Sequence, residues 1–232
     1  MAHSDQKTNI SRAEFMTLVN GIFGYTEVKA TTYTDVKADA WYADAVAKAA
    51  AAGYINGYPD GTMRPDNPIS REAATTIIMK INKLTENADA ANKFTDASTL
   101  VWSKGAVGAV EFAGIMIGYP DGSFQPKNLI KRGEAVFALD KSVTFSQNNV
   151  IYDKVGTYGP VTGDLQVTGN VIVQVKGTVL QNMVISGDLI IDKNVGDGNV
   201  TLKNVTVKGE TKIYGGGVNQ CHLVKRDIAR II

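Results

Sequence analysis

Three arginines occupy equivalent places in three similar segments of the chain. Arg12, Arg71 and Arg132 each lie two residues after an isoleucine and open a stretch with apolar residues at helical spacing, which predicts a first-turn position in a helix. A cation is locally unfavourable there, because the N-terminus of a helix carries partial positive charge. A carboxylate ligand would offset this, since free backbone N–H groups and a guanidinium fork can bind it together.

The same arginines have a structural interpretation that the sequence leaves open. Each can pair with a carboxylate of the protein itself, and the candidates are Asp35, Asp60, Asp96 and Asp121. Such a salt bridge does not exclude a ligand, because it can aim the guanidinium. The expected chemistry is therefore binding of an anion, with or without an internal partner.

Two tandem repeats must position these arginines. Residues 33–84 and 94–145 match without a gap, at an offset that pairs Trp41 with Trp102. Each copy predicts a helix, a turn loop and a second helix with an apolar face. A partial third copy near the N-terminus contains only the second helix, which begins after Ser11.

The turn loops of the two repeats are identical in sequence, Gly-Tyr-Pro-Asp-Gly, at residues 57–61 and 118–122. Proline fixes φ and glycine permits positive φ, as a tight turn between helices requires. The loops also offer backbone donors and an aromatic ring, Tyr58 or Tyr119, as a binding surface. The candidate ligand-binding residues there are Gly57, Tyr58, Asp60, Gly118, Tyr119 and Asp121.

Each full repeat also contains a tryptophan and an aspartate near its start, and two of the second helices contain a glutamate two residues after the arginine. We expect Trp41 and Trp102 to pack in the core rather than to serve as sugar platforms. Glu14 completes a capping box with Ser11, whereas Glu134 lacks the serine partner and is expected to be exposed. Asp35 and Asp96, which begin the repeats, are candidate structural or groove residues, and so are the two tryptophans.

From about residue 150 the sequence changes to alternating Val, Ile and Thr punctuated by glycine. The segment starting Gly163-Asp164 recurs at 187–191, 24 residues later, and more loosely at 209–213. Short strands with such a period are typical of the rungs of a parallel β-helix, and a β-sandwich is the alternative. We expect Asp164, Asp188 and Glu210 to form a ladder at equivalent rung positions.

The helical repeats resemble the S-layer homology (SLH) family. Its units contain Phe-x-Asp-Val, a tryptophan, the loop Asn-Gly-Tyr-Pro-Asp-Gly-Thr-Phe-x-Pro and a Thr-Arg-Ala-Glu helix; here these are residues 33–36, Trp41, residues 56–65 and residues 70–73. The resemblance implies a pseudo-threefold bundle that attaches exported proteins to pyruvylated cell wall polysaccharide through grooves between units. Three positions depart from the motif: Ala73 replaces glutamate, Lys131 replaces threonine or serine, and Ile117 replaces asparagine.

The composition excludes several other classes of protein. The formal net charge of +1 gives no general case for nucleic acid, and no apolar run approaches the length of a membrane span. One cysteine (Cys221) and two histidines (His3 and His222) argue against a disulfide framework, a metal centre or a catalytic relay. We therefore expect no catalytic residue, metal or cofactor.

The resulting hypothesis is a multi-domain chain that anchors an exported protein at the cell surface. It comprises a partial SLH repeat (1–30), two full repeats (31–92 and 93–147) and a β-helix-like domain (148–232), and we expect it to be a fragment without its signal peptide. Alternative functions are a self-associating surface-lattice protein and an anchor for a polysaccharide-cleaving β-helix enzyme. Another chain is a candidate to complete the half repeat.

Overall fold

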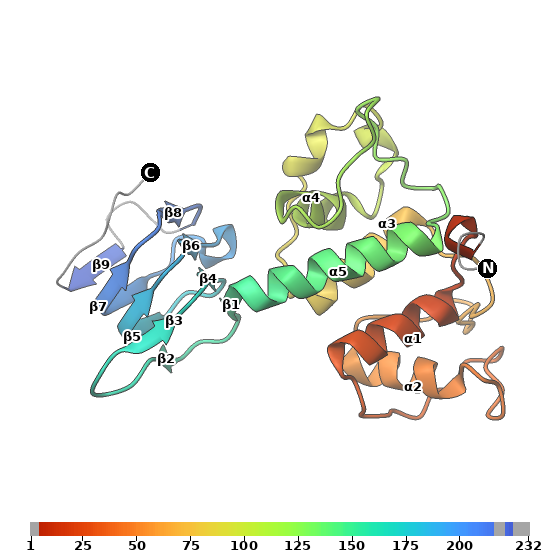
Figure 1. Ribbon diagram of the computed structural model, residues 1–232, viewed down its shortest axis with the longest axis horizontal. Helices are drawn as coiled ribbons and strands as arrows, with labels where there is room; N and C mark the ends of the chain where they lie inside the picture. Colours follow the sequence, from red (N-terminus) through yellow and green to blue (C-terminus); the bar gives the residue numbers. More distant parts are fainter. Residues whose placement is uncertain (1–4, 216–220, 225–232) are drawn as a thin grey trace. The chain divides into compact units, whose positions relative to one another are not determined.

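The computed structural model describes residues 5–215 and 221–224. The chain divides into two compact units, Met1–Val143 and Thr144–Ile232, and the boundary lies within a long helix. The first unit is helical and the second is built of strands (Figure 1). This order confirms the predicted sequence of helical repeats followed by a β-rich region. The calls on His3, and on the side chains of Cys221 and His222, lie outside the described residues.

The helical unit contains five α-helices joined by long loops. They are α1 (Arg12–Phe23), α2 (Ala43–Ala52), α3 (Arg71–Ile81), α4 (Lys104–Phe112) and α5 (Arg132–Asn148), with short 3-10 turns at Asp5–Lys7, Ala90–Lys93 and Ala97–Thr99. Helix α1 packs against α2 and α3 against α4 (Figure 1). The two pairs are related by the repeat, because α2 and α4 are first helices and α1 and α3 are second helices of their units. No helix in the described part of the chain is long and apolar enough to cross a membrane.

Local sequence sets the ends of these helices. Ser11 caps α1 by accepting a hydrogen bond from the Glu14 N–H, and the Glu14 carboxylate accepts one from the Ser11 N–H, so the predicted capping box is confirmed. Ser70 caps α3 in the same way but without a glutamate partner. Gly24 and Gly53 end α1 and α2 in the left-handed region, where glycine has no Cβ penalty.

Three isoleucines join the repeats at a pseudo-threefold centre. The Ile10 N–H donates to the Ile130 carbonyl at 3.2 Å, Ile69 to Ile10 at 3.0 Å, and Ile130 to Ile69 at 3.0 Å. All three side chains are buried, and each stabilises the fold by about 1.5–3 kcal/mol relative to an exposed side chain. The half repeat therefore closes this ring within the chain.

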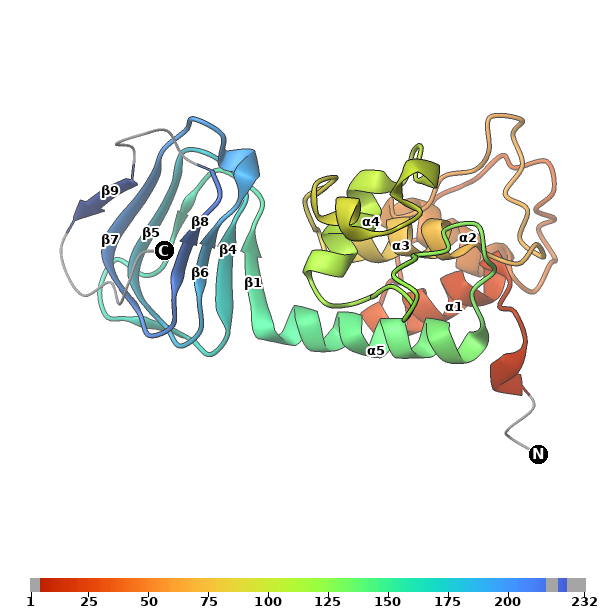
Figure 2. The same cartoon turned by 90° about the horizontal axis from the view of Figure 1, so that it is seen from above.

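The β-rich unit consists of two sheets in which every described pairing is parallel. One has the order β1-β4-β6-β8 and the other β2-β5-β7-β9, with β3 also paired to β5 (Figure 2). The strands are β1 (Asn149–Tyr152), β2 (Thr157–Tyr158), β3 (Leu165–Val167), β4 (Asn170–Val173), β5 (Thr178–Ile185), β6 (Leu189–Ile191), β7 (Val200–Val207), β8 (Thr211–Ile213) and β9 (Cys221–Val224), and the 3-10 turn Lys193–Val195 follows β6.

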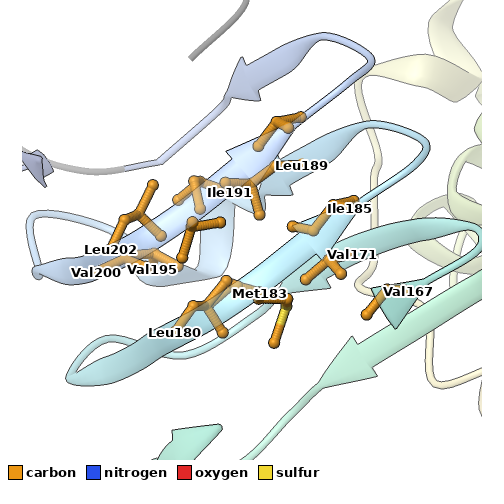
Figure 3. Close-up of a cluster of buried hydrophobic side chains, with 13 residues drawn as sticks. Val167, Val171, Leu180, Met183, Ile185, Leu189, Ile191, Val195, Val200 and Leu202 are labelled. Carbon is orange, nitrogen blue, oxygen red and sulfur yellow. The ribbon is translucent and has the colours of Figure 1, made fainter. Parts of the chain in front are cut away.

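The inward residues of both sheets form one apolar core, with Leu180, Met183 and Leu189 fully buried (Figure 3). Buried and less buried residues alternate along β5 and β7, as the sequence alternation predicts. The alternation is interrupted once in each strand, at Gln181-Asn182 and at Lys203-Asn204, where Asn182 and Asn204 have positive φ. This core is separate from that of the helical unit, since its members all belong to residues 167–207.

The register of the sheets corrects the predicted carboxylate ladder. Leu189 pairs with Val171 and Thr211, so Asp188 lies in line with Asn170 and Glu210. Leu165 pairs with Met183, and Met183 with Val205, so Asp164 lies in line with Asn182 and Asn204 instead. The prediction that Asp164 and Asp188 occupy equivalent positions was wrong. Two different corners of the chain share the local pattern Gly-Asp followed by a strand, and this produced the misleading offset of 24 residues.

Candidate functional site

The side chains of Arg12 and Arg71 turn inward to the loop of the next repeat. Arg12 Nε donates to the Met63 carbonyl at 2.9 Å, and Arg71 Nε donates to the Phe124 carbonyl at 3.0 Å. The two residues are only 6% and 5% exposed. Each guanidinium therefore lies between the second helix of one repeat and the loop of the following repeat.

The helix N-termini do not supply the free N–H groups that the sequence suggested. They donate instead to carbonyls of a neighbouring segment, at 2.8–3.0 Å. The pairs are Arg12 to Asn67, Ala13 to Pro65, Arg71 to Asn128, Glu72 to Pro126, and Arg132 to Thr8. The expectation was wrong because the three units pack through these backbone groups. Binding of an anion at these sites therefore depends on the arginine side chains.

The predicted pairing of the arginines with aspartates is also wrong. Asp35 accepts hydrogen bonds from the Met63 and Arg64 N–H groups, at 2.8 and 2.7 Å, and so fixes the loop that receives Arg12. Asp96 does the same at Phe124 and Gln125, both at 2.8 Å. The carboxylates hold Arg64 and Gln125 at φ of 53° and 56°, a conformation that side chains rarely adopt.

The loop aspartates close their own turns. Asp60 accepts from the N–H and hydroxyl of Thr62 and pairs with Arg64 at 2.8 Å. The hydrogen bond from the Thr62 hydroxyl has the largest effect on the pKa of Asp60, and the hydrogen bond from Arg64 has the next largest; together with the Thr62 N–H they lower this pKa to about 2. Asp121 bonds to Ser123 in the same way, and its pKa is also lowered. These carboxylates act on the loop and not on Arg12 or Arg71.

The aromatic wall of each site is partly covered by arginine. The Arg12 guanidinium lies 5.0 Å and the Arg64 guanidinium 4.0 Å from the centroid of the Tyr58 ring. Arg71 lies 4.5 Å from the Tyr119 ring. Cation–π contacts of this kind contribute about 0.5–2 kcal/mol, so the tyrosines hold the guanidinium in place as well as lining the site.

The loop glycines are required by packing. A Cβ on Gly57 would lie 2.3 Å from the Tyr33 ring, and one on Gly118 would lie 2.5 Å from the Phe94 ring. The Gly57 N–H donates to the Tyr33 hydroxyl at 3.3 Å, so this donor is already used. These two glycines shape the loops by allowing the close approach of the two rings.

The tryptophans are exposed, contrary to the prediction of core positions. Trp41 is 62% and Trp102 58% exposed. The helices α2 and α4 begin later than the apolar pattern suggested, at Ala43 and Lys104. Both tryptophans therefore lie in the turn before the helix, where helical spacing does not direct them inward.

Two glutamates, and not the aspartates, pair with two of the three arginines. Arg132 pairs with Glu14, and Arg71 Nη1 lies 3.9 Å from Glu134 Oε1. Glu134 also accepts from the Lys131 N–H at 2.9 Å and from the Tyr119 hydroxyl at 3.2 Å, so the expectation of a simply exposed glutamate was wrong. Arg12 forms no ion pair with any described residue.

Arg12 is consequently a buried cation without an ion-paired carboxylate among the residues that the structure describes. Burial, followed by the charge of Arg64 as the next lowering effect, reduces its pKa below the ordinary value. Removing a charge from water costs several kcal/mol, and the Met63 carbonyl and the Tyr58 ring offset only part of that cost. The sequence reasoning missed Met63 and Arg64, although their position after the Asp-Gly turn and before Pro65 marked a constrained loop.

No group of side chains suited to a metal ion occurs among the described residues. The chemistry that the arrangement supports is therefore recognition of an anion by a fixed guanidinium beside a tyrosine. Burial fixes the orientation of the guanidinium in advance, which reduces the ordering cost of binding.

Two segments of the chain match the sequence model of a known family. Residues 32–75 and 93–136 match the family described as S-layer homology domain. The chain contains two S-layer homology domains. The matched segments include both Gly-Tyr-Pro-Asp-Gly loops and both arginines of the full repeats, Arg71 and Arg132, which confirms the resemblance predicted from the motifs.

Two of the relatives of the SLH region have names that refer to the cell surface or to anchoring. The chain is 31% identical to cell surface glycoprotein 1 of Acetivibrio thermocellus, with 58% of this chain and 6% of that protein covered. It is 30% identical to the cellulosome-anchoring protein of the same organism, with 59% and 32% covered. The chain thus spans less than a third of the length of either relative. Their names agree with the predicted location at the cell surface.

A solved structure also shares sequence with the chain. A chain of the chitinase ChiW of Paenibacillus sp. str. FPU-7, described as a cell-surface-expressed multi-modular enzyme, is 50% identical over 30% of this chain and all of that one. The TM-score is 0.29, which is too low for a comparison of folds.

Proposed function

We propose that the SLH repeats attach an exported protein to the bacterial cell wall by binding an anionic, pyruvylated secondary cell wall polysaccharide. The observation that carries this proposal is Arg12, a guanidinium that is 6% exposed, lies beside the Tyr58 ring and has no ion pair in the described chain. Anchoring is also the role that the cellulosome-anchoring relative has by name.

A pyruvate ketal suits such a site on chemical grounds. It presents a carboxylate on a rigid ring attached to a sugar, so one fixed guanidinium can bind the charge while the sugar lies against an aromatic residue. Tyr58 is 37% exposed and provides such a surface. A neutral polysaccharide would leave the buried charge of Arg12 uncompensated, and we therefore expect it to bind poorly.

A pull-down with cell-wall sacculi tests this proposal. The intact chain should sediment with untreated sacculi and remain in solution with sacculi whose ketal pyruvate has been removed by mild acid. Lys212→Ala, in the β-rich unit, is the matched control and should sediment like the unchanged chain. Equal sedimentation with treated and untreated sacculi would refute recognition of the ketal.

We further propose the division of the chain into a partial repeat (1–30), two repeats (31–92 and 93–147) and a β domain (148–232). In this proposal the β domain is a short parallel β-helix that acts as a spacer. The parallel pairing of all described strands and the single core enclosed by two sheets support it. Limited proteolysis should leave a fragment starting near residue 148, and cleavage within the β strands would argue against it.

A further inference from the structure

The second helices α1 and α3 each pack against the first helix of the following repeat, whereas α5 has no such neighbour. Helix α1 packs against α2, and α3 packs against α4 (Figure 1). No α-helix follows α5 in the described chain, which continues instead into strand β1. One face of α5 therefore lacks the helix and loop that cover the equivalent faces of α1 and α3, and a repeat unit needs such a neighbour to bury its apolar residues.

The burial of equivalent residues identifies this face. Val136 corresponds to Met16 in α1 and to Thr75 in α3. Met16 and Thr75 are fully buried, whereas Val136 is 53% exposed. One turn further along the helix, Asp140 is exposed where its equivalent Asn20 is buried. The exposed stripe thus runs along the side of α5 on which the other two second helices meet a first helix.

The contacts that cover α1 and α3 show what the missing neighbour supplies. In α1, Asn20 Nδ2 donates to the Ala45 carbonyl of α2 at 3.0 Å. The hydroxyl of Tyr54, which follows α2, donates to Asn20 Oδ1 at 2.7 Å. In α3, the Thr75 hydroxyl lies 3.4 Å from Sδ of Met116, which follows α4. A first helix and the segment after it therefore cover this face in both complete pairs.

The start of α5 shows the same deficit at a single donor atom. Arg12 Nε donates to the Met63 carbonyl at 2.9 Å. Arg71 Nε donates to the equivalent Phe124 carbonyl at 3.0 Å. Arg132 forms an ion pair through a terminal nitrogen, but its Nε is buried and has no acceptor among the described residues. A buried donor without an acceptor is unfavourable, and a loop carbonyl equivalent to those two would satisfy it.

The two first helices that the chain contains define the chemistry of a fitting neighbour. Helices α2 and α4 are short, and each buries a valine among alanines, Val46 in α2 and Val107 in α4. Each is followed by a Gly-Tyr-Pro-Asp-Gly loop. A helix of this kind can lie along Val136, because its apolar face is narrow and its side chains are small.

We propose that the α5 face, formed by Arg132, Val136 and Asp140, is a docking surface for a helix–loop half repeat carried by another polypeptide. The partner has a short helix rich in alanine and valine and a Gly-Tyr-Pro-Asp-Gly loop, and a carbonyl after that loop accepts from Arg132 Nε. A second copy of this chain fits less well, because both of its half repeats already cover its own α1 and α3. The surface does not depend on glycan recognition.

A synthetic peptide of residues 32–63 is the probe, because it contains the turn before α2, α2 itself and the loop up to the Met63 carbonyl. It carries a fluorophore and an amidated C-terminus, and fluorescence anisotropy measures its binding to the full chain. The titration extends to millimolar concentrations, because ordering the peptide on binding costs affinity. One peptide should bind per chain. The peptide with Val46→Asp should not bind, because Val46 is fully buried against α1 in the intact pair.

Two substitutions one residue apart form a matched pair on the full chain. Val136→Asp should weaken peptide binding at least about tenfold, because it places a charge in the apolar contact. Phe137→Asp adds the same charge at a position whose equivalent in α1, Thr17, is exposed beside a docked first helix. It should therefore bind within about threefold of the unchanged chain. Both side chains are more than half exposed, so both variants should keep the Tm of the unchanged chain.

Three results would overturn the proposal. Equal binding by Val136→Asp and Phe137→Asp, or no binding of the peptide at all, would show that the α5 face is not a docking surface for a half repeat. A dimer of the unchanged chain in sedimentation equilibrium that Val136→Asp dissociates would show that a second copy covers the face instead. Retention on sacculi is measured separately, so failure of the docking surface is distinguishable from failure of anchoring.

Discussion

Removal of the Asp35 carboxylate should destabilise the helical unit and disorder the loop that holds Arg12. Asp35 accepts two backbone hydrogen bonds, from Met63 at 2.8 Å and Arg64 at 2.7 Å. A hydrogen bond to a charged group contributes about 1.5–3 kcal/mol, and water can replace part of it at this half-buried position. Asp35→Ala should therefore lower the free energy of unfolding by about 2–4 kcal/mol.

Thermal unfolding of the helical unit measures this effect. For a unit of this size each kcal/mol shifts Tm by about 2–4 °C, so Asp35→Ala should lower Tm by roughly 5–15 °C. Both tryptophans of the chain, Trp41 and Trp102, lie in this unit, so their fluorescence reports its unfolding together with far-UV circular dichroism.

Two controls bracket the result. Asp35→Asn keeps one acceptor oxygen and should lose about half as much stability. Asp39→Ala changes an exposed carboxylate with no hydrogen bond in the described chain and should leave Tm unchanged. If Asp35→Ala has the same Tm as Asp39→Ala, the Asp35 carboxylate does not fix the loop. The explanation of how Arg12 is positioned would then be wrong.

Three further predictions concern the loops and the β-rich unit. Gly118→Ala should destabilise the helical unit by about 1–3 kcal/mol, because the added Cβ would lie 2.5 Å from the Phe94 ring and 2.8 Å from the Ser123 carbonyl oxygen. Chemical denaturation measures this, and an unchanged midpoint would contradict the requirement for glycine. Asn204→Ala should destabilise the β-rich unit by about 1–3 kcal/mol, because it places alanine at φ of 53° and removes the hydrogen bond to Asn182. Asn204→Gly should recover the part of that loss that comes from backbone strain, because glycine adopts positive φ without a steric cost. An NMR titration of the Asp60 carboxylate should give a midpoint near pH 2. The stabilising ion pair with Arg64 is then fully present above the ordinary carboxylate pKa and is lost as the pH falls through about 2. A midpoint near pH 4 would contradict the observed hydrogen bonds.

The sequence predicted the repeats, the second helices and the capping box because these depend on local patterns. Ser11 and Glu14 are three residues apart, and their mutual bonds follow from helix geometry alone. The offset between repeats also placed Arg12 and Arg71 correctly at the starts of helices. Parallel strands in the C-terminal region followed from alternation and from the nearly constant offset between the repeats, which hairpins alone do not explain.

The direction of the arginine side chains could not be predicted in this way. Their partners, Met63 and Phe124, are more than 50 residues distant in sequence and contribute carbonyl groups, which carry no signature of residue type. The N–H groups of the helix starts were also paired through long-range packing. In the β-rich unit, the true register differs from the most similar sequence segments because Asp164 and Asp188 lie at different corners.

The ring of Ile10, Ile69 and Ile130 has a consequence for the order in which the chain can fold. Its hydrogen bonds join residues separated by about 60 and 120 positions, and loop closure over such spans is slow. In a nascent or translocating polypeptide, the hydrogen bond from Ile10 to Ile130 therefore cannot form until more than a hundred following residues are available. Unlike a solenoid, in which units can be added or deleted one at a time, this assembly gains its final cooperativity in a single late step.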